Sequence, residues 1–170
     1  MTEEAWQRQF REFEHTAFRL ETRDRYNSPD EVERVRRFVA GEPLVNRDHD
    51  WFRMVRAATR SGRTFRRVRV VTRPLGDYSR YGINSSVSNN AAGEDIRYLD
   101  RADARSISLP DDGDWWLFDS HRLVRMHFDG SDDRFLGGEL VTDPGAVVDA
   151  NRWRDLAWHD AWLRETFHAG

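Results

Sequence analysis

Short apolar runs bounded by polar turn residues stand out most clearly in the stretch DDGDWWLFDSHRLVRMHFD, which spans residues 111–129. This pattern predicts two strands, Trp115–Asp119 and Arg122–Phe128, joined by a short polar link. In the first of them, the WWLF sequence places apolar side chains on both faces, as is typical of a strand that is covered on each side. We therefore predict an interior strand here, ending in a turn at Asp119.

Apolar spacings of three and four residues predict amphipathic helices on either side of this strand pair. The predicted helices cover residues 3–21, 29–40, 50–60, 77–89 and 144–167. The buried stripe of the first is expected to contain Trp6, Phe10, Phe13 and Ala17. In the second, Ser28 and Glu31 have the spacing of a capping box. Its buried stripe is expected to contain Val32, Val35, Phe38 and Val39. Before the third, His49 and Asp50 are interpreted as a capping pair rather than half of a metal site.

Three more segments rich in β-branched and apolar residues complete the predicted sheet. RTFRRVRVVT fits a strand at residues 63–72, DIRYL at 95–99 and RFLGGELVT at 134–142. With the helix at 77–89, the first two form a parallel βαβ unit. We predict one α/β (α+β) domain with a single mixed sheet of about five strands flanked by helices. Its expected parts are a three-helix N-terminal region (1–62), a sheet core (63–143) and a long C-terminal helix (144–170).

Composition limits the classes of protein that the chain can represent. Its 170 residues, 38% of them hydrophobic, suffice for one domain with a real core. The absence of cysteine excludes disulfides and thiolate metal sites and suits a reducing cytoplasm. No lysine occurs, so all 27 basic residues are arginine, and the net charge of -3 disfavours nonspecific nucleic-acid binding. Without a signal sequence or an apolar span, the chain is predicted to be cytoplasmic with no membrane partner.

Polar side chains cluster around the turn of the predicted βαβ unit. The candidate ligand-binding residues are Arg69, Arg73, Asp77, Tyr78, Arg80 and Asn84, together with Asp119 at a strand end. Ligands of open α/β sheets bind at the carboxyl ends of parallel strands, and the planar fork of arginine suits a carboxylate or phosphate. The sequence thus predicts a site for a small anionic ligand. The alternative is an ion-pair network at the sheet edge among Arg73, Asp77, Arg80, Glu94 and Asp95.

No catalytic motif accompanies these residues. Phosphate loops, nucleophile elbows, dinucleotide-binding glycine motifs and the HExxH zinc motif are all absent from the sequence. Asp119, Ser120 and His121 are adjacent in sequence, so their side chains point apart and do not form a triad. We therefore predict no catalytic residue, no metal and no cofactor. A hydrated cation site formed by Glu94, Asp95 and Asp119 is the alternative.

Four segments carry a resemblance that extends over nearly the whole chain. They are FRLETRDRY (18–26), RVRVVTRPLGDYSRY (67–81), NNAAGEDIRYLDR (89–101) and DWWLFDSHRLVRMHFD (114–129). Together they resemble an actinobacterial family classified only as a domain of unknown function. Members of that family tend to sit near helix-turn-helix regulators. The resemblance therefore implies a regulatory or accessory role, with such a regulator as protein partner.

A second, more distant resemblance covers residues 63–144. The order strand, helix, strand and then a strand ending in aspartate is similar to one half of a phospholipase D-like domain. The catalytic motif of that superfamily is His, any residue, Lys, four residues and Asp, whereas this chain has Asp112 and Asp114 in place of the His and the Lys. Only Asp119 matches, so the resemblance implies a catalytically silent scaffold.

These observations favour a non-enzymatic regulatory or accessory module that recognises a protein partner or a small anionic ligand. One alternative is a small enzyme of specialised metabolism that uses Asp77, Tyr78 or Asp119 for acid–base chemistry in a polar cleft after the first strand. A second alternative is nucleic-acid binding through the arginines of the 63–72 strand.

Overall fold

A computed structural model describes residues 1–44, 49–111 and 113–167. Its strands are β1 (Thr16–Glu21), β2 (Thr64–Val71), β3 (Glu94–Asp100), β4 (Trp115–Phe118), β5 (Arg122–Phe128), β6 (Phe135–Val141) and β7 (Trp162–Leu163). Within the described residues they form one seven-stranded sheet, in the order β6-β5-β4-β1-β2-β3-β7. The β1–β2 and β2–β3 pairs are parallel and the other neighbours are antiparallel. The predicted mixed sheet is confirmed, with seven strands instead of about five.

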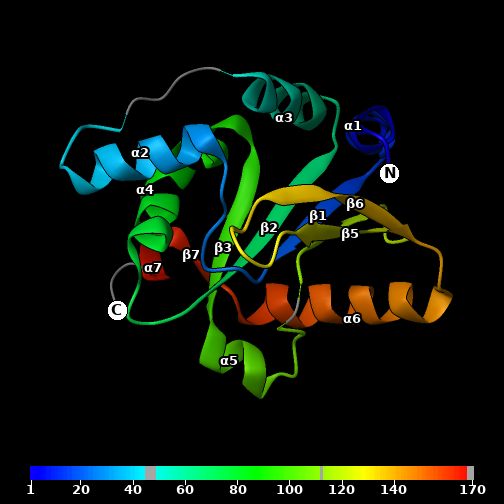
Figure 1. Cartoon of the computed structure of the whole chain (residues 1–170). Helices are drawn as coiled ribbons and strands as arrows, with labels where there is room; N and C mark the ends of the chain where they lie inside the picture. The colour runs from blue at the N-terminus through cyan, green and yellow to red at the C-terminus, as the bar shows by residue number, and fades with distance from the viewer. Residues whose placement is uncertain (45–48, 112, 168–170) are drawn as a thin grey trace.

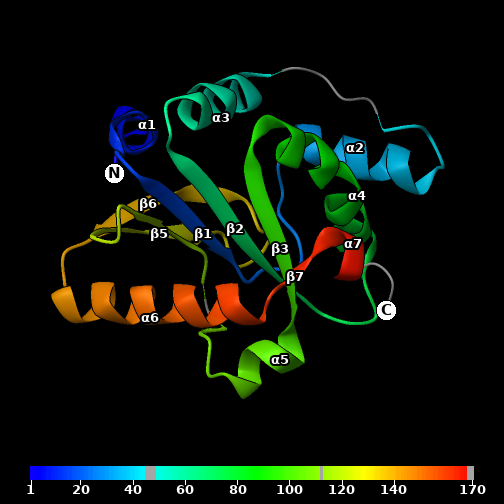
Figure 2. The same ribbon diagram turned by 180° about the vertical axis from the view of Figure 1, so that it is seen from behind.

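Helices cover both faces of this twisted sheet (Figure 1). They are α1 (Glu3–Glu12), α2 (Pro29–Val39), α3 (Asp50–Arg60), α4 (Asp77–Ala92), α5 (Arg101–Ser106), α6 (Pro144–Asp160) and α7 (Arg164–Phe167). The long helix α6 lies across one face, while α1, α3 and α4 lie over the other (Figure 2). Within the described ranges, none of these helices is long and apolar enough to cross a membrane.

The alternation in β4 divides the core into two layers, as predicted for an interior strand. Trp115 and Leu117 belong to the cluster under α6, and Trp116 and Phe118 belong to the cluster under α1 and α3. All four side chains are buried. β4 therefore holds the two layers together from the middle of the sheet.

The prediction of one helix over residues 3–21 is wrong. α1 ends at Glu12, Phe13 is extended, and β1 follows and pairs with both β2 and β4. The Asp119 carboxylate accepts the backbone N–H groups of residues 14, 15 and 16 at 2.8–3.0 Å, so these groups do not continue the helix. The apolar spacing from Phe13 to Ala17 suited a helix by coincidence, because both residues are buried, one before and one within a central strand.

The C-terminal helix is also shorter than predicted. α6 ends at Asp160 and Ala161 is extended. Trp162 and Leu163 then pair with Tyr98 and Arg97 as the edge strand β7, and α7 follows. The tryptophan-rich helical pattern continues across this break because Trp162, the one aromatic residue of the edge strand, follows Trp158 at the four-residue spacing of a helix.

The predicted burial of α2 is wrong as well, although the helix itself is confirmed. Ser28 occupies the N-cap position but its side chain makes no capping hydrogen bond. Val32 and Val39 are 50% and 53% exposed, and no residue of the helix is fully buried. α2 packs on α4 through Phe38 and Tyr81, whose rings are 5.9 Å apart, and it stands away from the sheet. This arrangement leaves space between α2 and the sheet.

The remaining elements lie close to their predicted positions. The β2-α4-β3 unit is parallel as expected, and α3 begins at Asp50, although the His49 side chain makes no capping hydrogen bond. The connection predicted between β3 and β4 contains the short helix α5.

Candidate functional site

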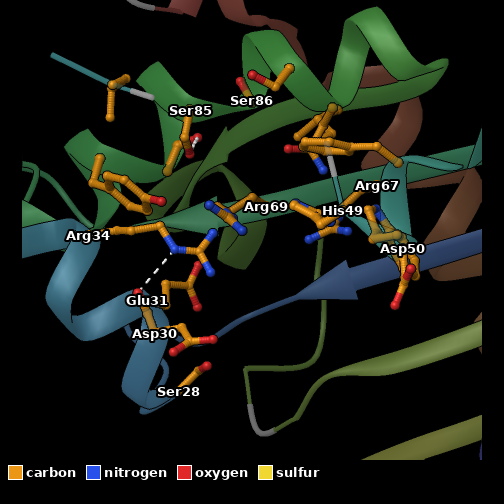
Figure 3. Close-up of a pocket in the computed structure, with 18 of the residues that line it drawn as sticks. Ser28, Asp30, Glu31, Arg34, His49, Asp50, Arg67, Arg69, Ser85 and Ser86 are labelled. Atoms are coloured by element: carbon orange, nitrogen blue, oxygen red, sulfur yellow. Dashed lines mark hydrogen bonds between the residues drawn. The ribbon is translucent and has the colours of Figure 1, made fainter. Parts of the chain in front are cut away.

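A cleft of about 930 Å³ lies between the sheet and helices α2, α3 and α4. Figure 3 shows Glu31 and Arg34 of α2 on one side and Ser85 and Ser86 of α4 on another. The sheet provides the floor, which includes Arg67 and Arg69 of β2 together with Arg19 of β1. A smaller cavity of about 240 Å³ adjoins it and shares these three arginines.

The arginines of the floor belong to a buried ion-pair network, called here the arginine network. Its members are Arg19, Glu21, Arg67, Arg69, Glu94 and Asp114, each with a side chain no more than 14% exposed. Alternation along β1 and β2 points the arginines and Glu21 toward the α3–α4 face of the sheet. Neighbouring strands therefore bring opposite charges together in a layer that would otherwise be apolar.

Glu21 is the centre of the network. It accepts from Arg67 Nη1 at 2.7 Å, from Arg69 Nε at 2.5 Å and lies 3.1 Å from Arg19 Nη1. Burial by itself would raise the pKa of Glu21, but the three guanidinium groups outweigh it and hold that pKa well below its usual value. The carboxylate is therefore ionised over the whole physiological pH range.

Glu94 connects the network to the helices above it. It accepts from Arg67 Nε at 2.9 Å, from the indole N–H of Trp51 in α3 at 3.0 Å and from the Asn89 amide of α4 at 2.8 Å. Two helices and two strands are thus fixed to one carboxylate that is 1% exposed.

Asp114 closes the other end of the network. It accepts from the Thr22 backbone N–H at 2.8 Å, from Arg19 Nη2 at 3.3 Å and from the Tyr26 hydroxyl. Burial and the nearby carboxylates raise the pKa of Tyr26 well above its usual value, so the hydroxyl remains protonated and donates. The loop after β1 is therefore fixed to the start of β4.

Among the predicted site residues, Arg69 and Tyr78 lie together at the two cavities. Arg69 is on the shared floor and Tyr78 lines the smaller cavity together with Glu31 of α2. Burial raises the pKa of Tyr78 well above its usual value. Gly82 permits the close approach of α4, because a Cβ at that position would lie 2.1 Å from Arg69 Nη1.

The other four candidates of the βαβ turn do not line either cavity. Arg73 pairs with Asp100 at 2.9 Å and lies over the Phe167 ring. Asp77 and Arg80 pair with each other on the exposed side of α4. The Asn84 amide donates to the backbone carbonyl of Arg80 at 2.8 Å. The alternative of one sheet-edge network is replaced by separate pairs, since Glu94 pairs with Arg67 and Asp95 with Arg97.

Asp119 lies apart from the cleft and its role in the structure is a turn. It accepts three backbone N–H groups before β1, and its pKa is lowered because these bonds and Arg122 outweigh the effect of burial. Ser120 Oγ accepts from Arg154, and the His121 ring contacts the Asp119 carbonyl, so no triad forms. In the described ranges, no three His, Asp or Glu side chains gather as a metal site.

The sequence does not predict most of the arginine network. The helix predicted over residues 3–21 includes Arg19 and Glu21, and Asp114 stands out only as the residue in place of the phospholipase D-like lysine. The alternation of FRLETR, with apolar residues 18 and 20 on one face and charged residues 19 and 21 on the other, was the available signal. Asp112, the other position of that comparison, lies outside the described residues.

Comparison with known protein families gives a match to one family over nearly the whole chain. A family model described as Domain of unknown function (DUF6879) matches residues 4–169. The chain belongs to this family. Every residue of the arginine network and of the cleft lies within the DUF6879 match. A search of curated proteins found no match to this DUF6879 member.

Proposed function

We propose that this DUF6879 member is a non-enzymatic binding module that takes a small ligand into the cleft over the arginine network. The single observation that carries the proposal is the cleft itself, about 930 Å³ in volume, with three ion-paired arginines in its floor. This volume is within the range of small-molecule sites, which combine apolar walls with a few fixed polar groups.

The fixed geometry of the floor supports binding. Each guanidinium group of the network is held by at least one buried carboxylate, and Glu94 adds bonds to α3 and α4. Groups that are already oriented need little further ordering when a ligand binds, so less of the interaction free energy is lost.

The protonation states of the site favour binding over acid–base catalysis. A general acid or base works best with a pKa near the operating pH. The pKa of Glu21 is shifted well below that range and the pKa of Tyr78 well above it. Asp119, the third acid–base candidate of the sequence analysis, makes backbone hydrogen bonds away from the cleft.

The burial of the arginine strand also bears on nucleic-acid binding. Arg67 and Arg69 are only 10% and 11% exposed at the side chain, and both pair with Glu21. They lie in the floor of a cleft and do not form the exposed basic surface that contacts a phosphate backbone.

We extend the proposal to a regulatory role, with a protein partner such as a helix-turn-helix regulator. What supports this step is the resemblance to an actinobacterial family found near such regulators, and the similarity to a phospholipase D-like half-domain whose catalytic positions are replaced. In that role, ligand occupancy of the cleft is the signal that the partner reads.

A thermal-shift screen tests the binding proposal. Wild type, Arg69→Met and Arg80→Met are each mixed with a panel of small metabolites that contains carboxylates, phosphates, amines and neutral compounds. Arg80 is the control because it is an exposed arginine of α4, the helix that borders the cleft. It pairs with Asp77 outside the cleft. We expect some compounds to raise the Tm of wild type and Arg80→Met but not of Arg69→Met. A panel without any stabilising compound, or equal responses of both variants, would overturn the proposal.

A further inference from the structure

Five arginines line the cleft, and one of them has no carboxylate partner within the described residues. Three belong to the arginine network, and Arg37 pairs with Glu42 at 2.6 Å. Arg34 of α2 instead donates from Nε to the backbone carbonyl of Asp30 at 3.0 Å, a bond that does not involve the Asp30 carboxylate. Its guanidinium charge is therefore not matched by an ion pair.

Arg34 and Arg69 face the same space from opposite sides. Figure 3 shows the Arg34 side chain extending from α2 into the cleft toward Arg69 on the floor. Arg69 uses Nε to bind Glu21, and its Nη atoms have no hydrogen-bond acceptor among the described residues. Two guanidinium groups with unused donors thus converge on one region of the cleft.

We propose that the cleft binds a molecule with a single carboxylate, and that Arg34 and Arg69 hold this carboxylate between them. The inference rests on the proposed function, since it identifies the ligand class of the same cleft. Planar guanidinium groups bind carboxylates through paired hydrogen bonds, which fixes both the position and the orientation of the ligand.

The surroundings favour a carboxylate over a phosphate. The hydroxyls of Ser85 and Ser86 donate to carbonyls of their own helix, at 3.3 Å and 2.8 Å, and supply no further donors for a third oxygen. Glu31 lies beside Arg34, and it repels a dianion more strongly than a monoanion, as do the other carboxylates that line the cleft (Asp30, Glu33, Glu42 and Asp50). Among its described residues, the cleft therefore offers one guanidinium group without an ion pair, that of Arg34, and few hydrogen-bond donors, and this combination suits a ligand with a single negative charge.

The other side chains that line the cleft indicate which kind of group carries the carboxylate. Aromatic residues line it on three helices, with Phe38 on α2, Trp51 and Phe52 on α3 and Tyr81 on α4. Aromatic side chains favour flat apolar groups through stacking and edge-to-face contacts. The ligand is therefore an amphipathic carboxylate with a ring or another compact apolar body.

Binding of this kind links α2 to the sheet. α2 has no fully buried residue and packs mainly on α4. A carboxylate bridging Arg34 and Arg69 adds a contact between α2 and β2, so the backbone amides of α2 exchange more slowly when the ligand is bound.

The experiment uses pairs of compounds that differ only in charge. Phenylacetate and indole-3-acetate are compared with their neutral amides and with phenyl phosphate, by calorimetry and by hydrogen exchange of α2. The proteins are wild type, Arg34→Gln and Arg36→Gln, the last being an exposed arginine of the same helix that pairs with Glu33 and does not line the cleft. We expect the acids to bind at least about tenfold more tightly than the amides, a difference lost in Arg34→Gln and kept in Arg36→Gln.

The possible outcomes separate this inference from the proposed function. Equal binding of acids and amides, or full affinity in Arg34→Gln, would overturn the carboxylate assignment while the cleft remains a binding site. Tighter binding of phenyl phosphate than of phenylacetate would overturn the choice of a monoanion. A failure of all these compounds, together with a metabolite panel that shifts no Tm, would remove both proposals.

Discussion

Replacement of Glu21 by glutamine tests whether the arginine network stabilises the fold as a unit. The side chain is 1% exposed and faces three guanidinium groups. Removing one partner of a buried ion pair costs about 3–5 kcal/mol, because the remaining charge stays buried without compensation. The glutamine amide still offers one acceptor oxygen, so we expect a loss at the lower end, about 3 kcal/mol.

Urea unfolding and calorimetry measure this loss. In a domain of this size, about 3 kcal/mol corresponds to a decrease in Tm of roughly 6–12 °C. Glu42→Gln is the matched control, because Glu42 pairs with Arg37 at the surface and both side chains are more than 40% exposed. An exposed pair of this kind contributes less than about 1 kcal/mol. If Glu21→Gln and Glu42→Gln lose similar amounts of stability, the network does not act as described.

Three further predictions concern the same structure. Because the pKa of Glu21 is lowered on folding, its contribution to stability is complete above the usual value of 4.5 and is lost as the pH falls through the folded-state pKa. The urea midpoint of wild type should therefore fall between pH 5 and pH 3 by more than the midpoint of Glu21→Gln. Equal decreases in the two proteins would contradict this. Gly82→Ala should cost about 1–3 kcal/mol by overpacking against Arg69 Nη1, and a double-mutant cycle should show that the cost disappears in an Arg69→Met background. In Asp119→Asn, asparagine tolerates the observed φ of 51°. It replaces one of the two carboxylate oxygens that accept three backbone N–H groups with an amide NH₂, which cannot accept. It should cost about 1–2 kcal/mol in urea unfolding and leave any ligand-induced Tm shift unchanged.

The sequence predicted those elements whose pattern reflects a local cause. β4 and β5 follow from short apolar runs bounded by polar turn residues, and the parallel β2-α4-β3 unit follows from a β-branched run, a helix closed by Gly93 and a second short strand. The C-terminal ends of α1 and α6 could not be predicted from the sequence, because residues that are distant along the chain determine where each helix ends. The Asp119 carboxylate, more than 100 positions away, ends α1, and pairing with β3 turns residues 162–163 into an edge strand.

The sequence brings together only those cavity residues that lie close to one another along the chain. Arg69 and Tyr78 lie on a strand and the helix that follows it, and the structure brings both to the adjoining cavities. The sequence does not indicate Arg34 as a site residue, because the apolar spacing of α2 predicts a stripe that faces the core, whereas the helix stands off the sheet and forms a wall of the cleft. Glu21, Glu94 and Asp114 come from three separate segments, and no local pattern indicates that their carboxylates meet on the same arginines.

The energetics of the arginine network bear on why it is present at all. Burial removes three guanidinium and three carboxylate groups from water, and the desolvation cost offsets most of the attraction between them. In other proteins, apolar side chains of similar volume in place of such networks are often neutral or stabilising by about 1–4 kcal/mol. The strands of this sheet use apolar residues on the opposite face, under α6, so the chain is able to build that kind of layer. Stability alone therefore does not account for the six buried charged side chains whose arginines form the floor of the cleft. The proposed carboxylate site would account for them, because a rigid polar floor that presents the Nη donors of Arg69 opposite Arg34 recovers its stability cost in affinity when a ligand binds.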